Sequence, residues 1–275
     1  MKGSQRAGLW ISRLVIWIVI LFTLFPASWI LIASFSDGQS FFRTSLFPNA
    51  LSVQNYKRLF SETGFLSWVG NSLKLCLCVS AIQLFLTSTS AYAFSRMRFP
   101  GRKNGLMTLL VLQVFPSSMA VAGYYILIYR FGLSDSLLAL ILVLAGGSAF
   151  NIWLLKAYVD TIPKELDEAA FVAGAGHFTV FIKIILPLAR PQIAVIFVFS
   201  FIAAYSEYVI SSIFLNTPAK HTLAVGLQTF ITNQFAANWT LFAAAAVLSS
   251  LPIMVIFMFM QRFIQNGLAA AGLKG

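Results

Sequence analysis

The residues whose types and spacing could do chemistry are few, and most lie in one segment, "DEAAFVAGAGHFTVFIKIILPLARP" at residues 167–191. It holds two acids, a Gly-Ala-Gly triplet, one histidine and two prolines, and it lies between long apolar runs. It contains no His-Glu-x-x-His pair, nucleophile elbow or cysteine cluster, the patterns typical of metal and hydrolytic sites. The segment therefore indicates docking rather than catalysis.

Elsewhere the candidates for metal, thiol or nucleotide chemistry are weak. His177 and His221 are isolated in the sequence, so we expect ordinary polar residues and no metal site. Cys76 and Cys78 are two positions apart and would point away from each other on a helix. The phosphate-binding pattern G-x-x-x-x-G-K-[ST] is absent, and its nearest approach, 267–274, has no Gly-Lys pair. We expect no cofactor on this chain.

The residues from Thr161 into the segment 167–191, which we call the docking segment, predict a short amphipathic helix. Thr161 can cap it, and Pro163 suits its first turn, where a missing N–H costs nothing. The acids Glu165, Asp167 and Glu168 favour the positive end of the helix dipole.

The rest of the segment predicts a bend and a second helix. Gly174 and Gly176 end or bend the first helix. A second helix is expected over 178–186, with a break at Pro187. A helix face of small residues suits close docking into a groove of another protein; from the residues alone, a helix lying on a membrane surface is equally supported. That face consists of Leu166, Ala169, Ala170 and Ala173.

Composition places these elements in a membrane protein. Of the 275 residues, 59% are hydrophobic and 10% are charged, and the mean hydropathy is +0.84. Soluble domains have about 25% charged residues, so this chain cannot cover a globular surface with polar side chains. A large soluble helical protein is therefore excluded.

Six apolar runs approach or exceed the ~20 helical residues that cross a bilayer. Lipid offers the backbone no hydrogen-bond partners, so the runs should be helices; they lack the alternation of barrel strands. The first exceeds the ~7–15-residue core of a signal peptide and is expected to be retained. The runs are 14–35, 75–94, 105–129, 133–155, 192–214 and 241–260.

The positive charge follows the expected topology. With the N-terminus inside, thirteen of the nineteen Lys and Arg residues lie in inner segments and five in outer ones. This bias predicts cytoplasmic termini and accounts for the net charge of +11, so we expect no nucleic-acid partner. We expect one transmembrane domain, 1–275, with a core at 68–262 and a tail at 263–275. Its cytoplasmic loop is 156–190, and its main outer loops are 36–67 and 215–240.

The docking segment resembles the EAA motif of ABC importer permeases. Many members of that family have Asp before the glycine, where this chain has Ala173. Longer stretches, including "SFIAAYSEY", "TLAVGLQTF" and "NGLAAAGLKG", resemble carbohydrate-uptake permeases, in particular the smaller membrane subunit of maltose/maltodextrin importers. The motif residues are Glu168, Ala169, Ala170, Gly174, Ile184, Leu186 and Pro187.

The resemblance implies a fold, partners and a location. The fold would be all-α and integral to the membrane, with six transmembrane helices arranged as in type I ABC importer permeases. The EAA helix would dock in a cytoplasmic ATPase homodimer, which carries ATP and Mg. Glu168 could pair with a basic residue there, and Gly174 would permit the bend. A second, related permease and an extracytoplasmic sugar-binding protein complete such importers, which lie in the bacterial cytoplasmic membrane.

Seven further residues are candidates for contacts. Glu207, inside a predicted span, could face a pore or a second subunit, or could reach interfacial water. In the outer loop, amide side chains could contact sugar hydroxyls and an aromatic side chain could stack; ordinary loop amides and an interfacial aromatic are the alternative. The resemblance also implies that the tail contacts the ATPase, against the alternative of a frayed terminus. The loop residues are Asn233, Gln234, Asn238 and Trp239, and the tail residues are Asn266 and Gly267.

Together these features predict a subunit of an ATP-driven oligosaccharide importer, with maltose or maltodextrin favoured. Galacto-oligosaccharides or a trehalose-like sugar are alternative substrates. A stand-alone secondary transporter or channel would show inverted repeats or several intramembrane charges, and the sequence shows neither. A membrane enzyme would require clustered catalytic residues, which the sequence lacks.

Overall fold

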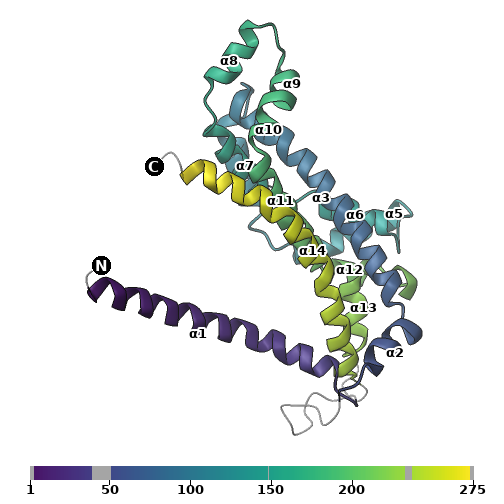
Figure 1. The fold of residues 1–275 in the computed structure, drawn as a ribbon. Helices are drawn as coiled ribbons and strands as arrows, with labels where there is room; N and C mark the ends of the chain where they lie inside the picture. Colours follow the sequence, from purple (N-terminus) through teal and green to yellow (C-terminus); the bar gives the residue numbers. More distant parts are fainter. Residues whose placement is uncertain (1–2, 39–50, 148, 233–236, 273–275) are drawn as a thin grey trace. The chain divides into compact units, whose positions relative to one another are not determined.

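The computed structural model describes residues 3–38, 51–147, 149–232 and 237–272. Every regular element in these ranges is helical (Figure 1). The chain falls into two compact units, Met1–Leu66 with Gly226–Leu251 and Ser67–Val225 with Pro252–Gly275. The all-helical fold agrees with the sequence, and the single transmembrane domain stays a prediction.

The first unit holds the end of α1 (Gly3–Ser34) beside α2 (Gln54–Glu62) through one buried amide. Asn55 Nδ2 donates to the carbonyls of Ser34 and Ser36, at 3.1 and 2.9 Å. These carbonyls at the end of α1 have no partner within that helix, so the amide supplies what the helix end lacks. The apolar part of α1, Leu9–Ser34, is long enough to cross a membrane and buries almost nothing within the chain.

The second unit contains the longest continuous series of elements. Several are short, because proline, glycine and polar residues interrupt the apolar runs. Its elements, some shared with the first unit, are α3 (Phe65–Arg96), α4 (Arg102–Leu112), η1 (Ser117–Ala120), α5 (Val121–Arg130), α6 (Leu137–Ala145), α7 (Ala149–Asp160), α8 (Glu165–Val172), α9 (His177–Val180), the π turn η2 (Phe181–Ile185), α10 (Leu186–Leu188), α11 (Arg190–Tyr205), α12 (Val209–Phe214), η3 (Pro218–Lys220), α13 (Leu223–Thr229) and α14 (Trp239–Gly272).

Three single helices are long and apolar enough to cross a membrane, and two bent pairs bring the number to five. The single helices match the first, second and sixth predicted spans. The fourth is α6 followed by α7, bent by 48°. The third is not one helix: α4 ends at Leu112, and Pro116, which cannot donate a backbone hydrogen bond, precedes η1 and α5. Six crossings remain a prediction.

The predicted helix break at Pro187 is wrong. The helix continues through Pro187 to Leu188, and the chain turns by 80° before α11, at Ala189. Proline in a helix interior clashes with the carbonyl four residues earlier, here that of Lys183. Lys183 belongs to the wider π turn Phe181–Ile185, which explains how the helix accommodates the ring.

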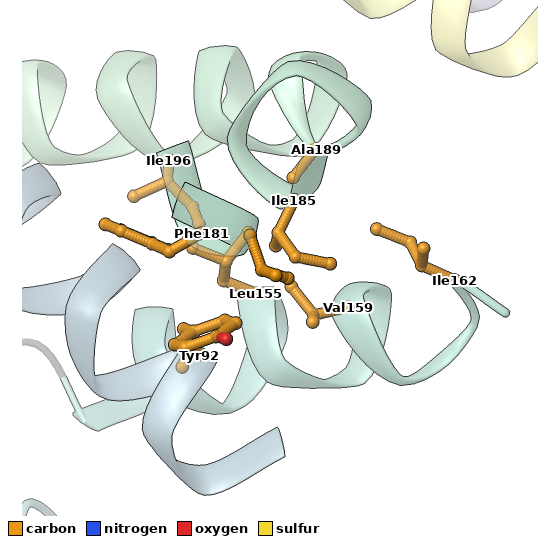
Figure 2. Packing of buried hydrophobic residues seen from close by; sticks show 10 residues of the cluster. Tyr92, Leu155, Val159, Ile162, Phe181, Ile185, Ala189 and Ile196 are labelled. Carbon is orange, nitrogen blue, oxygen red and sulfur yellow. The ribbon is translucent and has the colours of Figure 1, made fainter. Parts of the chain in front are cut away.

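A core cluster lies where α3, α7 and the segment from α9 to α11 meet. Figure 2 shows Tyr92 of α3 and Leu155 and Val159 of α7 facing Phe181 and Ile185. The rings of Tyr92 and Phe181 are 5.2 Å apart between centroids. Burial of these side chains is the main force holding the segment that follows α8 against α3 and α7. The cluster is completed by Ala91, Ile162, Val180, Ala189 and Ile196.

Candidate functional site

Helix α8 carries the EAA residues and begins later than the sequence predicts. Its N-cap is Lys164, and no side chain caps it. Thr161 is not the cap, which corrects the prediction: its hydroxyl donates to the carbonyl of Tyr158 at 2.7 Å. Because α7 runs to Asp160, Thr161 serves the end of that helix. The acids do lie in the first turn of α8, as expected.

One of those acids is buried in an ion pair that the sequence did not predict. Arg96 Nε lies 2.5 Å from Asp167 Oδ2, and the two side chains are 5% and 6% exposed. Arg96 Nη2 also donates to the carbonyl of Ile162 at 2.7 Å. From the sequence, Arg96 is one basic residue of the inner segments, and Asp167 is an acid that favours the helix dipole. The two are 71 positions apart, and no local pattern indicates that they meet.

Further polar contacts join α3 to α7 around this pair. Ser95 Oγ donates to Asp160 Oδ1 at 2.6 Å, and Lys156 Nζ lies 2.5 Å from Asp160 Oδ2. Arg102 donates to the carbonyls of Phe94 and Ser95, both at 2.9 Å, and so serves the end of α3. The network fixes the end of α3 next to the chain that leads into α8.

The predicted small-residue face is divided between the core and the surface. Ala170 packs against the core cluster, whereas Ala169 and Ala173 are exposed. Glu168 is exposed as well. Val172 is 91% exposed and Leu166 is 44% exposed. The outward side of α8 therefore combines small and apolar residues with two exposed acids, Glu165 and Glu168, while Asp167 holds the inward side.

The bend after α8 is a glycine-terminated helix end. Gly174 has φ +83°, which glycine adopts without the penalty of a side chain. Its N–H donates to the carbonyl of Phe171, and the N–H of Ala175 to that of Ala170, both at 2.9 Å. These two bonds form a Schellman motif, so the predicted helix end at Gly174 is confirmed.

The second half of the motif packs beneath the bend. Tyr92 Oη and His177 Nδ1 are 3.1 Å apart, and the rings of His177 and Phe171 are 4.9 Å apart between centroids. Leu186 and Pro187 are half-buried, and Leu186 packs against the core cluster. These contacts hold the bend to α3, and an ATPase contact by Leu186 and Pro187 stays a prediction. His177 has the packing of an ordinary polar residue.

Glu207 caps a helix. Its Oε1 accepts the N–H of Ile210 at 2.6 Å, and its Oε2 accepts the N–H and the hydroxyl of Ser211 at 2.9 and 2.5 Å. These donors open α12, where helices need acceptors. Glu207 also lines a cavity of about 1060 Å³ in the second unit, and contact with a pore or a second subunit stays a prediction.

The same cavity is lined at two other helix interruptions. Gln83 Nε2 donates to the carbonyl of Leu144, near the end of α6, at 2.8 Å. Gln113 Oε1 accepts the N–H of Phe150, at the start of α7, at 3.0 Å. Irregular backbone at membrane depth is tolerated where side chains satisfy it or where it lines a cavity, and both hold here.

Asp135 is a second acid whose partners no sequence pattern indicates. Asp135, in the turn between α5 and α6, accepts hydrogen bonds from Thr217 Oγ1 at 2.6 Å and from the N–H of Asn216 at 2.9 Å. Lys220 Nζ lies 2.9 Å from its carboxylate. The Thr217 hydroxyl, with the lysine and the backbone donors, lowers the pKa of Asp135 well below its usual range. An Asp preceded by Gly-Leu-Ser looks like an ordinary turn residue.

The remaining predicted contact residues are scattered. Asn238 is almost buried and caps α14: its Oδ1 accepts the N–H of Leu241 at 3.0 Å. Trp239 meets Phe242 edge to face at 6.1 Å. Asn233 and Gln234 lie outside the described residues. Asn266 and Gly267 lie in the last turns of α14, where only the backbone is described. Sugar and ATPase contacts by these residues stay predictions.

The described ranges contain no group of three His, Cys, Asp or Glu side chains placed to hold a metal ion. The arrangement suits docking. A short helix is fixed on its inner side by an ion pair, ends at a glycine bend and exposes small residues on its outer side.

The sequence matches a known family model and several known proteins. A model described as "Binding-protein-dependent transport system inner membrane component" matches residues 3–269. The maltodextrin transport system permease protein MdxG of Bacillus subtilis (strain 168) is 40% identical over 230 residues, 83% of each chain. The galactooligosaccharides transport system permease protein GanQ of that organism is 37% identical and covers 100% of this chain and 99% of its own. The maltose/maltodextrin transport system permease protein MalG of Escherichia coli (strain K12) is 37% identical, covering 99% and 98%.

Solved structures share the fold. A chain of a bacterial ABC transporter involved in the import of the acidic polysaccharide alginate has a TM-score of 0.79 at 23% identity, covering 95% of this chain and 98% of its own. A chain of a bacterial alginate ABC transporter in complex with an alginate pentasaccharide-bound periplasmic protein has a TM-score of 0.68 at 19% identity, with 96% of both chains covered. At these identities the likeness concerns the fold alone.

Proposed function

This chain belongs to the family of binding-protein-dependent transport system inner membrane components, and on that basis we propose that it is the membrane-spanning subunit of an ATP-driven importer of oligosaccharides, with maltodextrins as its substrate class. Its relatives at 35–40% identity include permease proteins named for maltodextrin or maltose. Hydrolysis of ATP belongs to a partner, since the sequence lacks the phosphate-binding loop.

The observation that carries the proposal is the outward side of α8. Glu168, Ala169 and Val172 are exposed on α8, just before the glycine bend. A helical surface of small and apolar residues with two exposed acids, Glu165 and Glu168, suits insertion into a groove of another protein, because small side chains allow close approach. The EAA pattern lies on this helix. We assign it to contact with a cytoplasmic ATPase dimer.

The mechanism follows from such a contact. Closure of the ATPase on ATP displaces α8, and this chain with a second, related permease opens outward while a sugar-loaded binding protein delivers its cargo. Hydrolysis restores the inward-facing state, so that one side is open at a time. The cavity lined by Gln83, Gln113 and Glu207 offers amide and carboxylate groups at helix interruptions, and we assign it to the path of the sugar.

One alternative substrate has support of its own. GanQ, named for galactooligosaccharides, matches the whole chain at 37% identity. Maltodextrin is favoured because several relatives named for it match over most of their length. Stimulation of ATP hydrolysis by maltodextrin, against a galacto-oligosaccharide, in the assembled complex with its binding protein decides between the two.

The decisive experiment on the function is co-purification. The chain is expressed with the genes that neighbour it, and a tag on this subunit should recover an ATPase and a second permease. Val172→Glu, at a residue of α8 that is 91% exposed, should reduce ATPase recovery, whereas Leu51→Glu, at a residue of the first unit that is 78% exposed, should not. A wild-type chain that recovers no ATPase would refute the proposal.

A further inference from the structure

Burial of the Arg96–Asp167 pair carries a desolvation penalty that an apolar contact would not carry. Moving two charges out of water carries a desolvation penalty, which their mutual attraction and further hydrogen bonds must offset. Well-packed apolar side chains of similar volume often stabilise a fold as much or more. Here the penalty is offset only in part, because Asp167 Oδ1 is buried and has no hydrogen-bond partner among the described residues. Stability alone therefore does not account for the pair.

What the pair provides is a fixed geometry. Arg96 is the last residue of α3, a helix of 32 residues. Its guanidinium contacts Asp167 on α8 and the carbonyl of Ile162, which precedes α8. Apolar surfaces can slide past each other, whereas two opposite charges in contact, one of them also hydrogen-bonded to a backbone carbonyl, hold one register. The pair thus ties α8 to the end of α3 in one position.

The covalent route out of α8 is built differently. From Val172 the chain passes the glycine at 174, the π turn Phe181–Ile185 and the 80° bend at Ala189 before it enters α11. Each of these is a place where backbone geometry changes easily, and bends and π turns are common at moving parts. The core cluster holds the part of this route beyond Val180, so a displacement of α8 can be taken up at the Gly174 bend, whereas the ion pair contains no such bend.

We propose that Arg96 is a positioning residue that passes the displacement of α8 directly to α3 through Asp167. The proposal rests on the proposed function, in which an ATPase moves α8. It adds a second route of coupling, through side chains, beside the backbone route through α9–α11. In this proposal α3 moves as one rigid helix, and the force acts at its last residue, Arg96.

The test uses two double variants of the full chain in the assembled importer, reconstituted in lipid vesicles with its binding protein and maltodextrin. Arg96→Met with Asp167→Leu removes both charges and keeps apolar contact. Arg96→Asp with Asp167→Arg restores an ion pair in reverse. Arg58→Met with Glu62→Leu removes an exposed pair within α2 and serves as the control.

Assembly with the ATPase and basal hydrolysis should survive in the apolar variant, because α8 keeps its outward surface. The sugar transported per ATP hydrolysed should fall about fivefold or more, the scale of an allosteric coupling. The reversed pair should regain part of the loss, and the control should match wild type.

Unchanged transport per ATP in the apolar variant would overturn the proposal. So would failure of both double variants to assemble, because the pair would then be needed only for folding. Absence of an ATPase from the wild-type complex would instead refute the proposed function, and the two failures are told apart by that sample.

Discussion

Asp135 and Thr217 are 82 positions apart in the sequence, yet the Thr217 hydroxyl donates to the Asp135 carboxylate at 2.6 Å. The same carboxylate accepts two backbone N–H groups and faces Lys220 Nζ at 2.9 Å. The turn between α5 and α6 is thereby fastened to the residues that lead into η3. Trp68 and Asn71 of α3 hold the same loop from other points, by donating to the carbonyls of Pro218 and His221.

The first prediction concerns the charge of Asp135. Asp135→Asn tolerates the positive φ of 52° but offers a neutral acceptor in place of the carboxylate. Hydrogen bonds to charged groups contribute about 1.5–3 kcal/mol, so we expect a loss of roughly 1–2 kcal/mol at pH 7, measured as a lower melting temperature in detergent. Asp37→Asn, at an exposed aspartate, is the control and should not change the melting temperature.

The pH dependence of this difference follows from the pKa. The folded-state pKa of Asp135 lies below its unfolded value, which is about 3.9. Its contribution is therefore complete above about pH 4 and is lost as the pH falls from there through the folded-state pKa. Wild type and Asp135→Asn should converge in melting temperature in acid. A difference that stays constant down to pH 3 would contradict this assignment.

A second prediction separates two neighbouring glycines. At Gly174 an added Cβ meets no atom within 4 Å, but φ is +83°, so Gly174→Ala should cost about 1–2 kcal/mol through the backbone alone. At Gly176 an added Cβ also meets nothing, and φ is −85°. Gly176→Ala should therefore cost less, about 0.5 kcal/mol, because it only replaces glycine by alanine at the N-cap of α9. Melting temperature and sugar-stimulated ATP hydrolysis are measured for both, and equal effects would refute the role of the bend.

The sequence predicts much of the fold because a long apolar run in lipid must satisfy its backbone hydrogen bonds internally, which a helix does. It fails where the runs are interrupted. In the third run α4 ends at Leu112 and Pro116 follows in irregular chain, whereas the helix runs through Pro187, because a π turn at Lys183 makes room for the ring. Both are prolines in apolar runs, and the difference lies in the backbone geometry before them, which no local pattern encodes.

At the site, short-range features are predictable and long-range pairs are not. Gly174 and the acids of α8 follow from local rules for helix ends, and the structure has them in place. The Arg96–Asp167 pair depends on the packing of α3 against the start of α8. A charge count or a dipole argument places each residue on the correct helix and says nothing of its partner.

A third prediction tests Glu207 as a helix cap. Glu207→Ala removes the acceptors of two N–H groups and one hydroxyl at the start of α12, and losing such a cap costs about 0.5–2 kcal/mol. Glu207→Gln keeps one acceptor oxygen and should lose less. Melting temperature is compared with that of Ser206→Ala, at the exposed neighbour. If Gln lowers transport strongly while stability is kept, the carboxylate acts on the cavity and not only on α12.

The last prediction distinguishes a cap from a sugar contact at Asn238. As the cap of α14, Asn238 supplies one acceptor, Oδ1, to the N–H of Leu241 and to Thr240 Oγ1 at 3.2 Å. Serine caps a helix as well as asparagine does, and alanine does not. Asn238→Ala should then cost about 1 kcal/mol of stability, with Asn238→Ser close to wild type. A sugar contact would make both variants weaken the stimulation of ATP hydrolysis by maltodextrin, since serine is too short to replace the amide. We expect the pattern of a cap, because the side chain is only 9% exposed and its oxygen is already engaged.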